Sequence, residues 1–352
     1  MNNFDYVRPA TIADAITAAS APGAAYLAGG TNLLDLMKGR VAQPSRLVDI
    51  SRLPGLDRIE RLADGSVRIG ALVRNADLAH DKDFTRDYPA VAEALLSGAS
   101  AQLRNAATVG GNLVQRTRCA YFYDAASACN KRIPGAGCDA RGGDNRLHAV
   151  IGWSEHCIAT HPSDLCVPLV ALDAVVEIEG RHGRRDVALE ALHRLPGATP
   201  EQETTLEPGD LIVALRLPSA ARAFATRERY LKVRERTSYA FAVVSAAAAL
   251  TIADGKITAA RLALGGVAAK PWRARDAEAV LAGAEPSRAA YRRAAQAALA
   301  KAKPSGDNAF KIELAQRVIV RALSLAAAGT PDRVPALPAS PFSSAAGAIH
   351  VL

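Results

Sequence analysis

The feature that most restricts the fold of this chain is the position of its cysteines. All five lie between residues 119 and 166 of a 352-residue sequence, and three of them follow a Gly-Gly-Asn turn at residues 110–112. The segment from this turn to Cys157 contains Gly, Pro and Asn residues that indicate a long loop. Because ordered loops of such length are uncommon without a function or a cross-link, we expect the cysteines to order it.

The spacing of the cysteines leaves the chemistry of that cross-link open. Nine, eight and eighteen residues separate Cys119, Cys129, Cys138 and Cys157. No Cys-x-x-Cys pair is present, so neither a zinc ribbon nor a two-cluster ferredoxin pattern is matched. An iron–sulfur cluster, unligated thiols, and zinc or disulfides therefore all remain open, although five cysteines leave one outside any set of disulfides.

Other residues near the cysteines have simpler interpretations. Cys166 lies in the apolar run HPSDLCVPLVAL, which is typical of a small buried hydrophobic residue. His148, His156 and His161 are candidate ligands, although structural histidines in loops are the commoner case. We expect the aromatic run at residues 121–123 to shield the interior of the loop.

Two glycine turns are candidate phosphate-binding elements. AGGTNLL at residues 28–34 follows an expected strand, and TVGGN at residues 108–112 has the same character. Glycine lets the backbone approach a ligand, and the adjacent Thr and Asn side chains offer donors to phosphate oxygens. A single Gly-Gly pair usually marks a turn without a ligand, and neither stretch is a Walker A or GxGxxG sequence. The presence of two such turns, each with Thr and Asn beside the glycines, favours a pyrophosphate clamp.

The composition excludes several classes of protein. Hydrophobic residues make up 49% of the chain and charged residues 22%, as in folded globular proteins. No apolar run reaches eighteen residues, and the first residues, MNNFDYVRPATIADAI, lack the apolar core of a signal peptide. The formal charge is +8, but the sequence has no basic run with interleaved aromatic residues, which disfavours nucleic-acid binding. The excess of positive charge also suits an acidic partner subunit or an anionic ligand. No Ser-His-Asp, His-Glu-x-x-His or paired-carboxylate pattern is present, which disfavours a hydrolase.

Hydrophobic periodicity predicts mixed α and β structure throughout. We expect a parallel βαβ arrangement in the first fifty residues, with a helix opened by Thr11. Expected strands lie at residues 24–30, 47–53 and 66–73 and within 165–180 and 210–218, and expected helices at 9–21, 31–39 and 88–100. The pattern restarts near residue 222 with strands, a hairpin at Asp254-Gly255, and helices at 276–284, 287–302 and 308–329. Lys232 falls on an expected strand, where an exposed lysine is the default unless a phosphate or flavin faces it.

Seven stretches in one order resemble the FAD-binding subunit of the molybdenum hydroxylases, the group of xanthine dehydrogenase and carbon monoxide dehydrogenase. They are AGGTNLLDLMK, IGALVRNADLA, QLRNAATVGGNL, ATHPSDL, GDLIVALRLP, KVRERTSYAFAVVSAAAAL and LALGGVAAKPWRA. The resemblance implies an α+β fold: an FAD-binding domain of two α/β subdomains (PCMH-type) and a C-terminal α+β domain with an antiparallel sheet and helices. The implied domains are residues 1–222 (subdomains about 1–55 and 56–222, Cys-rich loop 115–160) and 223–330, followed by a Pro-, Ala- and Ser-rich tail at 331–352.

The resemblance also implies the cofactor contacts, position by position. The implied FAD-binding residues are Tyr26, Leu27, Ala28, Gly29, Gly30, Thr31, Asn32, Leu33, Leu34, Thr108, Gly111, Asn112, Asp164, Ile212 and Lys232. The inserted cysteine loop is similar to that of the flavin subunit of bacterial aldehyde oxidoreductases, which carry an added [4Fe–4S] cluster, as does 4-hydroxybenzoyl-CoA reductase. On this resemblance Cys119, Cys129, Cys138 and Cys157 are the metal ligands, Cys166 is not, and the chain has no catalytic residue of its own.

The implied function is electron transfer within a heterotrimer. A large molybdenum-cofactor subunit would oxidise the aldehyde, a small [2Fe–2S] subunit would pass electrons to FAD, and ferredoxin, a quinone-linked carrier or oxygen would accept them. The alternatives are a related enzyme acting on an aromatic acyl-CoA, a purine or carbon monoxide, and a non-redox zinc-binding assembly scaffold. The chain by itself predicts the cytoplasm, whereas the resemblance predicts the periplasm through co-export with a signal-bearing partner.

Overall fold

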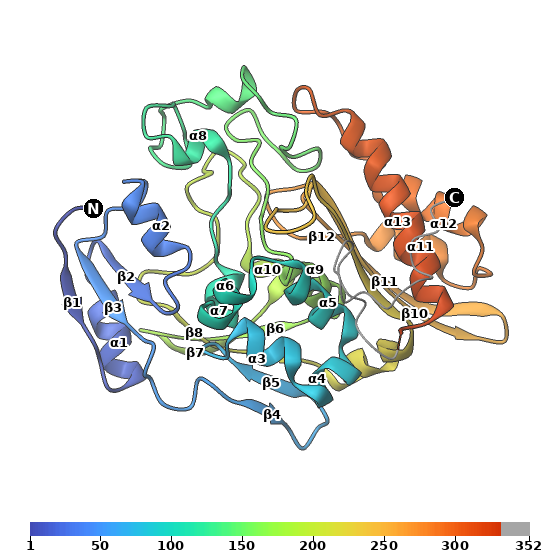
Figure 1. Cartoon of the computed structure of the whole chain (residues 1–352), viewed down its shortest axis with the longest axis horizontal. Helices are drawn as coiled ribbons and strands as arrows, with labels where there is room; N and C mark the ends of the chain where they lie inside the picture. Colours follow the sequence, from blue (N-terminus) through green and yellow to red (C-terminus); the bar gives the residue numbers. More distant parts are fainter. Residues whose placement is uncertain (332–352) are drawn as a thin grey trace.

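Three β-sheets, with the helices that connect and cover them, form the described part of the chain, residues 1–331 of the computed structural model (Figure 1). The tail predicted for residues 331–352 lies outside these residues except for its first position. The combination of parallel and antiparallel sheets with helices confirms the predicted α+β class. None of the described helices is both long and apolar enough to span a lipid bilayer.

The first sheet is parallel and confirms the predicted βαβ arrangement. Its strands, in spatial order, are β1 (Asp5–Val7), β3 (Arg46–Asp49) and β2 (Ala24–Leu27), and its helices are α1 (Ile12–Ala19) and α2 (Leu33–Lys38). Thr11 opens α1 as predicted, because its hydroxyl oxygen accepts a hydrogen bond from the Asp14 amide.

The second sheet is antiparallel, with the strand order β4-β5-β8-β6-β7. Its strands are β4 (Ile59–Arg61), β5 (Val67–Gly70), β6 (Val175–Gly180), β7 (Gly183–Ala188) and β8 (Leu211–Leu217). The helices beside it are α3 (Asn75–His80), α4 (Lys82–Asp87), α5 (Pro89–Ser97), α6 (Ala101–Ala106), α7 (Val109–Leu113), α9 (Cys166–Ala171) and α10 (Leu189–Leu192). The prediction of strand from residue 165 onward is wrong for the part that forms α9. A fully buried apolar run has no polar face, so periodicity did not separate helix from strand there.

The third sheet is antiparallel and follows a short connecting segment, η2 (Ser219–Arg227), which contains the predicted domain boundary. Its strands, in spatial order, are β12 (Trp272–Arg273), β11 (Lys256–Gly265), β10 (Val244–Ala253) and β9 (Glu228–Val233). The helices α11 (Arg275–Leu281), α12 (Arg288–Ala298) and α13 (Phe310–Ala328) cover it, with α13 packed along β10 (Figure 1). The predicted hairpin at Asp254-Gly255 is confirmed, and both residues have positive φ (49° and 73°), as a tight two-residue turn requires.

Residues 115–160 form the predicted long loop, in which α8 (Ala120–Tyr123) and η1 (Asp139–Arg141) are the regular segments. The part that carries α8 stands above α2 and α6 in the view of Figure 1. The far end of the loop is fixed by the start of the C-terminal helix α13. Asn308 and Lys311 are fully buried there and donate to backbone carbonyls within residues 147–149.

Candidate functional site

One large cavity, of about 1440 Å³, lies where the first sheet, the second sheet, the cysteine loop and the third sheet meet. This volume exceeds the roughly 300–1,000 Å³ of cavities that hold drug-sized ligands. All but one of the predicted FAD-binding residues line the cavity; the exception is Leu27, the last residue of β2. Tyr26 lines the cavity together with its neighbour Ala25, whereas Leu27 does not.

The first glycine turn forms one wall of the cavity and admits no side chain at its centre. A Cβ atom on Gly29 would lie 2.0 Å from the carbonyl oxygen of Ala106, which belongs to α6. Gly30 has a φ of +71°, a conformation that favours glycine. Asn32 joins this turn to the cysteine loop, because its Oδ1 accepts a hydrogen bond from the Arg116 amide at 2.9 Å.

The second glycine turn lies against the end of β5. Val109 and Gly110 donate their amides to the carbonyls of Val73 and Ala71, at 2.9 and 2.8 Å. A Cβ atom on Gly110 would lie 2.8 Å from that of Ala71, so this turn too requires glycine. Thr108 caps α7 by accepting from the Gly111 amide, and this bond leaves the Thr108 hydroxyl proton free to donate into the cavity.

Another wall of the cavity is formed by the Pro-Ser-Asp loop, residues 162–164, and by β9. Lys232 Nζ lies 2.7 Å from Asp164 Oδ2, and its side chain is only 3% exposed. The default of an exposed strand lysine is therefore wrong. Tyr230 donates its hydroxyl to Asp164 Oδ1 at 2.6 Å, and burial, together with the Asp164 charge, raises the Tyr230 pKa well above its usual value. Ser163 donates to Asn112 Oδ1 at 2.7 Å and so connects this wall to the second glycine turn.

These features fit a dinucleotide such as FAD. The first glycine turn, where a side chain on Gly29 would collide with backbone, lets the backbone come close to a diphosphate, and the Thr108 hydroxyl of the second turn can donate to its oxygens. The far end of the same cavity holds a buried Lys–Asp pair, which can face the polar edge of a flavin.

The structure brings Cys119, Cys129, Cys138 and Cys157 together around a second, small cavity beside the first. The backbones of Cys129 and Cys138 form an isolated antiparallel β-bridge. None of the four cysteines forms a disulfide. Burial raises the pKa of Cys119 to about 12 and also raises those of Cys138 and Cys157, so without a metal these thiols hold their protons. Phe122 is buried against Cys129 and Leu36, as expected of a shielding residue.

Four thiols around one cavity are a donor set for a metal centre, and the distances between their sulfur atoms bear on which kind. A tetrahedral zinc with sulfur ligands at about 2.3 Å needs sulfur atoms roughly 3.8 Å apart. Within residues 1–331, no three of the four loop sulfurs lie within 4.8 Å of one another. The free space between the four thiols is about 10 Å³.

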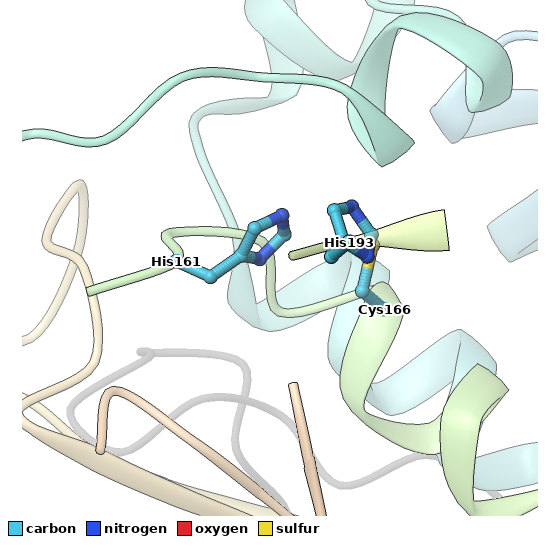
Figure 2. A group of neighbouring side chains, drawn as sticks. All are labelled: His161, Cys166 and His193. Atoms are coloured by element: carbon cyan, nitrogen blue, oxygen red, sulfur yellow. The ribbon is translucent and has the colours of Figure 1, made fainter. Parts of the chain in front are cut away.

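One group of side chains does meet the distance criterion for a single ion, namely His161, Cys166 and His193 (Figure 2). Their hydrogen bonds argue against a metal site. The Ser163 amide donates to His161 Nδ1 at 3.3 Å, and His193 Nε2 lies 2.7 Å from the Leu113 carbonyl, to which it donates. Both rings therefore carry their proton on Nε2, and the His161 Nδ1 lone pair accepts from the Ser163 amide. Only the Nδ1 lone pair of His193 is left to bind a metal ion.

This group is instead a packed part of the interior, of which His161 lines the large cavity. The two imidazole rings lie edge to face, with centroids 4.4 Å apart, and burial lowers both of their pKa values, which keeps them neutral. Cys166 is fully buried, as predicted. Of the other two candidate histidines, His148 Nε2 lies 3.2 Å from Cys119 Sγ and His156 is exposed.

Three charged residues of the site were not found by sequence reasoning. Glu203 pairs with Arg116, which lines the large cavity of about 1440 Å³, and with Lys131, which lines the small cavity between the four cysteines. We call these two cavities the flavin-sized cavity and the cysteine cavity. Glu203 lies in the polar stretch TPEQETT, 72 positions after Lys131, and nothing in that stretch indicates a buried partner. Tyr230 was also missed, although its position two residues before Lys232 places it on the same face of β9.

Comparisons with known proteins agree with this geometry. The family described as FAD binding domain in molybdopterin dehydrogenase matches residues 2–220, and the CO dehydrogenase flavoprotein C-terminal domain matches residues 229–326. The chain is 50% identical over 330 residues to the aldehyde oxidoreductase FAD-binding subunit PaoB of Escherichia coli (strain K12), covering 93% of this chain and 99% of that protein. It is 28% identical to the carbon monoxide dehydrogenase medium chain of Hydrogenophaga pseudoflava, covering 92% and 96%. A solved structure of carbon monoxide dehydrogenase from the same organism superimposes with a TM-score of 0.72 at 28% identity, covering 93% of this chain and 98% of that one.

Proposed function

Because this chain belongs to the FAD-binding medium subunits of the molybdenum hydroxylase family, we propose that it is the electron-transfer subunit of an aldehyde oxidoreductase and holds a [4Fe–4S] cluster as well as FAD. The observation that carries the proposal is that the two cavities share a wall. Thr117 and Cys119 line both of them. A group held by the four cysteines would thus adjoin the flavin, as electron transfer between them requires.

The chain's own residues would hold and separate the two groups. The glycine turns and Thr108 would bind the diphosphate of FAD, and Asp164 and Lys232 would face the flavin end. Cys119, Cys129, Cys138 and Cys157 would bind the cluster as thiolates. FAD accepts electrons singly and releases them singly or as a pair, which suits an intermediate between one-electron carriers and an external acceptor.

Membership of the family implies a large molybdenum subunit and a small iron–sulfur subunit as partners. We propose an aldehyde as the substrate of the complex because PaoB, at 50% identity, is a subunit of an aldehyde oxidoreductase. An aromatic acyl-CoA, a purine or carbon monoxide would be oxidised or reduced on the absent large subunit, so no residue here decides among them. The zinc scaffold is disfavoured by the separation of the loop sulfurs.

The test is the metal and flavin content of the purified complex and of the isolated chain, with low-temperature EPR after reduction by dithionite. We expect one FAD and about four irons per isolated chain, with the EPR signal of a reduced cubane. Flavin without iron would contradict the cluster and leave the flavin role intact. Anaerobic mixing of the complex with aromatic aldehydes, a purine or carbon monoxide would then identify which of them bleaches the flavin, and an acyl-CoA that is reduced would instead reoxidise the dithionite-reduced flavin.

The compartment is a separate prediction. Co-export with a signal-bearing partner predicts that the assembled complex fractionates with the periplasm, and that it remains in the cytoplasm when the partner's signal is deleted.

A further inference from the structure

Lys131 lies in the wall of the cysteine cavity, where its side chain is 6% exposed. Its ammonium donates to the Pro200 carbonyl at 2.9 Å and lies 3.0 Å from Glu203 Oε1. It is the lysine that lines this cavity, and it follows Cys129 by two positions.

Glu203 is shared between two cations. Arg116 pairs with Oε2 of the same carboxylate and lies over the Phe122 ring, with its guanidinium carbon 4.6 Å from the ring centroid. Burial alone would raise the pKa of Glu203, but Lys131 and Arg116 lower it below its usual value, so the group is a carboxylate. Two positive charges and one negative charge leave the group of three with a net charge of +1.

This surplus charge has no counterpart among the salt bridges of residues 1–331, where Glu203 is the acid paired with Lys131 and with Arg116. Buried ion pairs are costly to desolvate and are weak evidence of a stabilising role. A surplus positive charge between a cavity of four cysteines and a flavin-sized cavity instead matches an anionic occupant.

We propose that the positive charge of Lys131, partly offset by Glu203, sets the reduction potential of the cluster held by Cys119, Cys129, Cys138 and Cys157. The inference rests on the proposed function, since it requires that cluster. A [4Fe–4S]²⁺ core with four thiolates has a net charge of −2, and the addition of one electron makes it −3. A nearby fixed cation stabilises the reduced form more than the oxidised form and so raises the potential. Low exposure limits screening of this interaction by salt.

The experiment is an EPR-monitored redox titration of the purified complex carrying Lys131→Gln, Glu203→Gln or Lys131→Arg. Lys270→Gln is the control, because Lys270 is half-buried and, like Lys131, donates to a backbone carbonyl, that of Glu190, but does not line the cysteine cavity. We expect Lys131→Gln to make reduction about tenfold less favourable, which is a midpoint lower by about 59 mV for one electron. Glu203→Gln should raise the midpoint, and Lys131→Arg and Lys270→Gln should leave it near the wild-type value.

Iron and flavin contents distinguish the ways in which the proposal can fail. A wild-type chain without iron would overturn both this inference and the proposed cluster. Full iron content with an unchanged midpoint in Lys131→Gln would overturn this inference alone. If Lys131→Gln does not fold, Glu203→Gln decides: a raised midpoint supports the inference, and an unchanged or lowered one overturns it.

Discussion

Lys232 Nζ lies 2.7 Å from Asp164 Oδ2, and this buried ion pair joins the third sheet to the Pro-Ser-Asp loop across the flavin-sized cavity. Tyr230 donates to the other oxygen of the same carboxylate. The cavity is therefore closed by the C-terminal domain through one acid on which two side chains of β9 converge. Binding of FAD and docking of that domain are expected to depend on each other.

We first predict that Asp164→Asn weakens both stability and flavin retention. Loss of the carboxylate charge leaves the buried Lys232 without an ionic partner, and breaking a buried pair in this way typically costs about 3–5 kcal/mol. Flavin content after gel filtration and the urea midpoint measure the two effects. Asp83→Asn, in the exposed pair with Arg86, should change neither by more than the roughly 1 kcal/mol of a surface ion pair. Full flavin retention by Asp164→Asn would contradict the prediction.

The local parts of this fold and site were predictable from the sequence because their determinants are short-range. The cap at Thr11, the hairpin at Asp254-Gly255 and the glycine turns each depend on residue types within a few positions. The convergence of the four cysteines came from a resemblance, since their spacing alone left iron, zinc and free thiols open.

The remaining parts depend on contacts that no local pattern encodes. The run at residues 166–171 is buried on all sides, so it has no periodicity to separate a helix from a strand. The burial of Lys232 depends on Asp164, and the burial of Lys131 depends on Glu203. Such pairs form only when distant segments pack together.

We predict that Gly29→Ala abolishes flavin binding. The new methyl group would meet the Ala106 carbonyl at 2.0 Å, so the turn must move away from α6 and lose its shape. Gly142→Ala is the control, because its Cβ would have no neighbour within 4 Å and its φ of −103° suits alanine. Flavin content and the fluorescence of released FAD measure the outcome, and equal flavin in the two variants would argue against a tight cradle at Gly29.

We predict that stability falls through Glu228 as the pH rises from about 4.5 to about 8. Its carboxyl is fully buried between α5 and β9, where it accepts from the Ala90 amide while Oε2 has no partner, and burial raises its pKa to about 8. A folded-state pKa above the unfolded value stabilises the protein while the group is protonated. That contribution is fully present below the unfolded value and is lost as the pH rises through about 8.

The measurement is the urea midpoint of wild type and Glu228→Gln between pH 5 and pH 9. The wild-type midpoint should fall up to about pH 8, and that of Glu228→Gln should fall less, because glutamine keeps the carbonyl acceptor and cannot ionise. Parallel curves for the two proteins would show that other groups cause the loss of stability.

Finally, we predict that each of the four loop cysteines is required for iron and that Cys166 is not. Cys119, Cys129, Cys138 and Cys157 line one cavity, whereas Cys166 is fully buried in α9, and its sulfur lies 4.0 Å from the Leu113 carbonyl. Serine at any of the four positions should lower the iron content severalfold and leave the flavin bound, because the glycine turns and the Asp164–Lys232 pair are built from other residues. Cys166→Ala should retain both cofactors. Iron loss from Cys166→Ala with iron retained in Cys138→Ser would reverse the assignment and return the His161–Cys166–His193 group to consideration as a metal site.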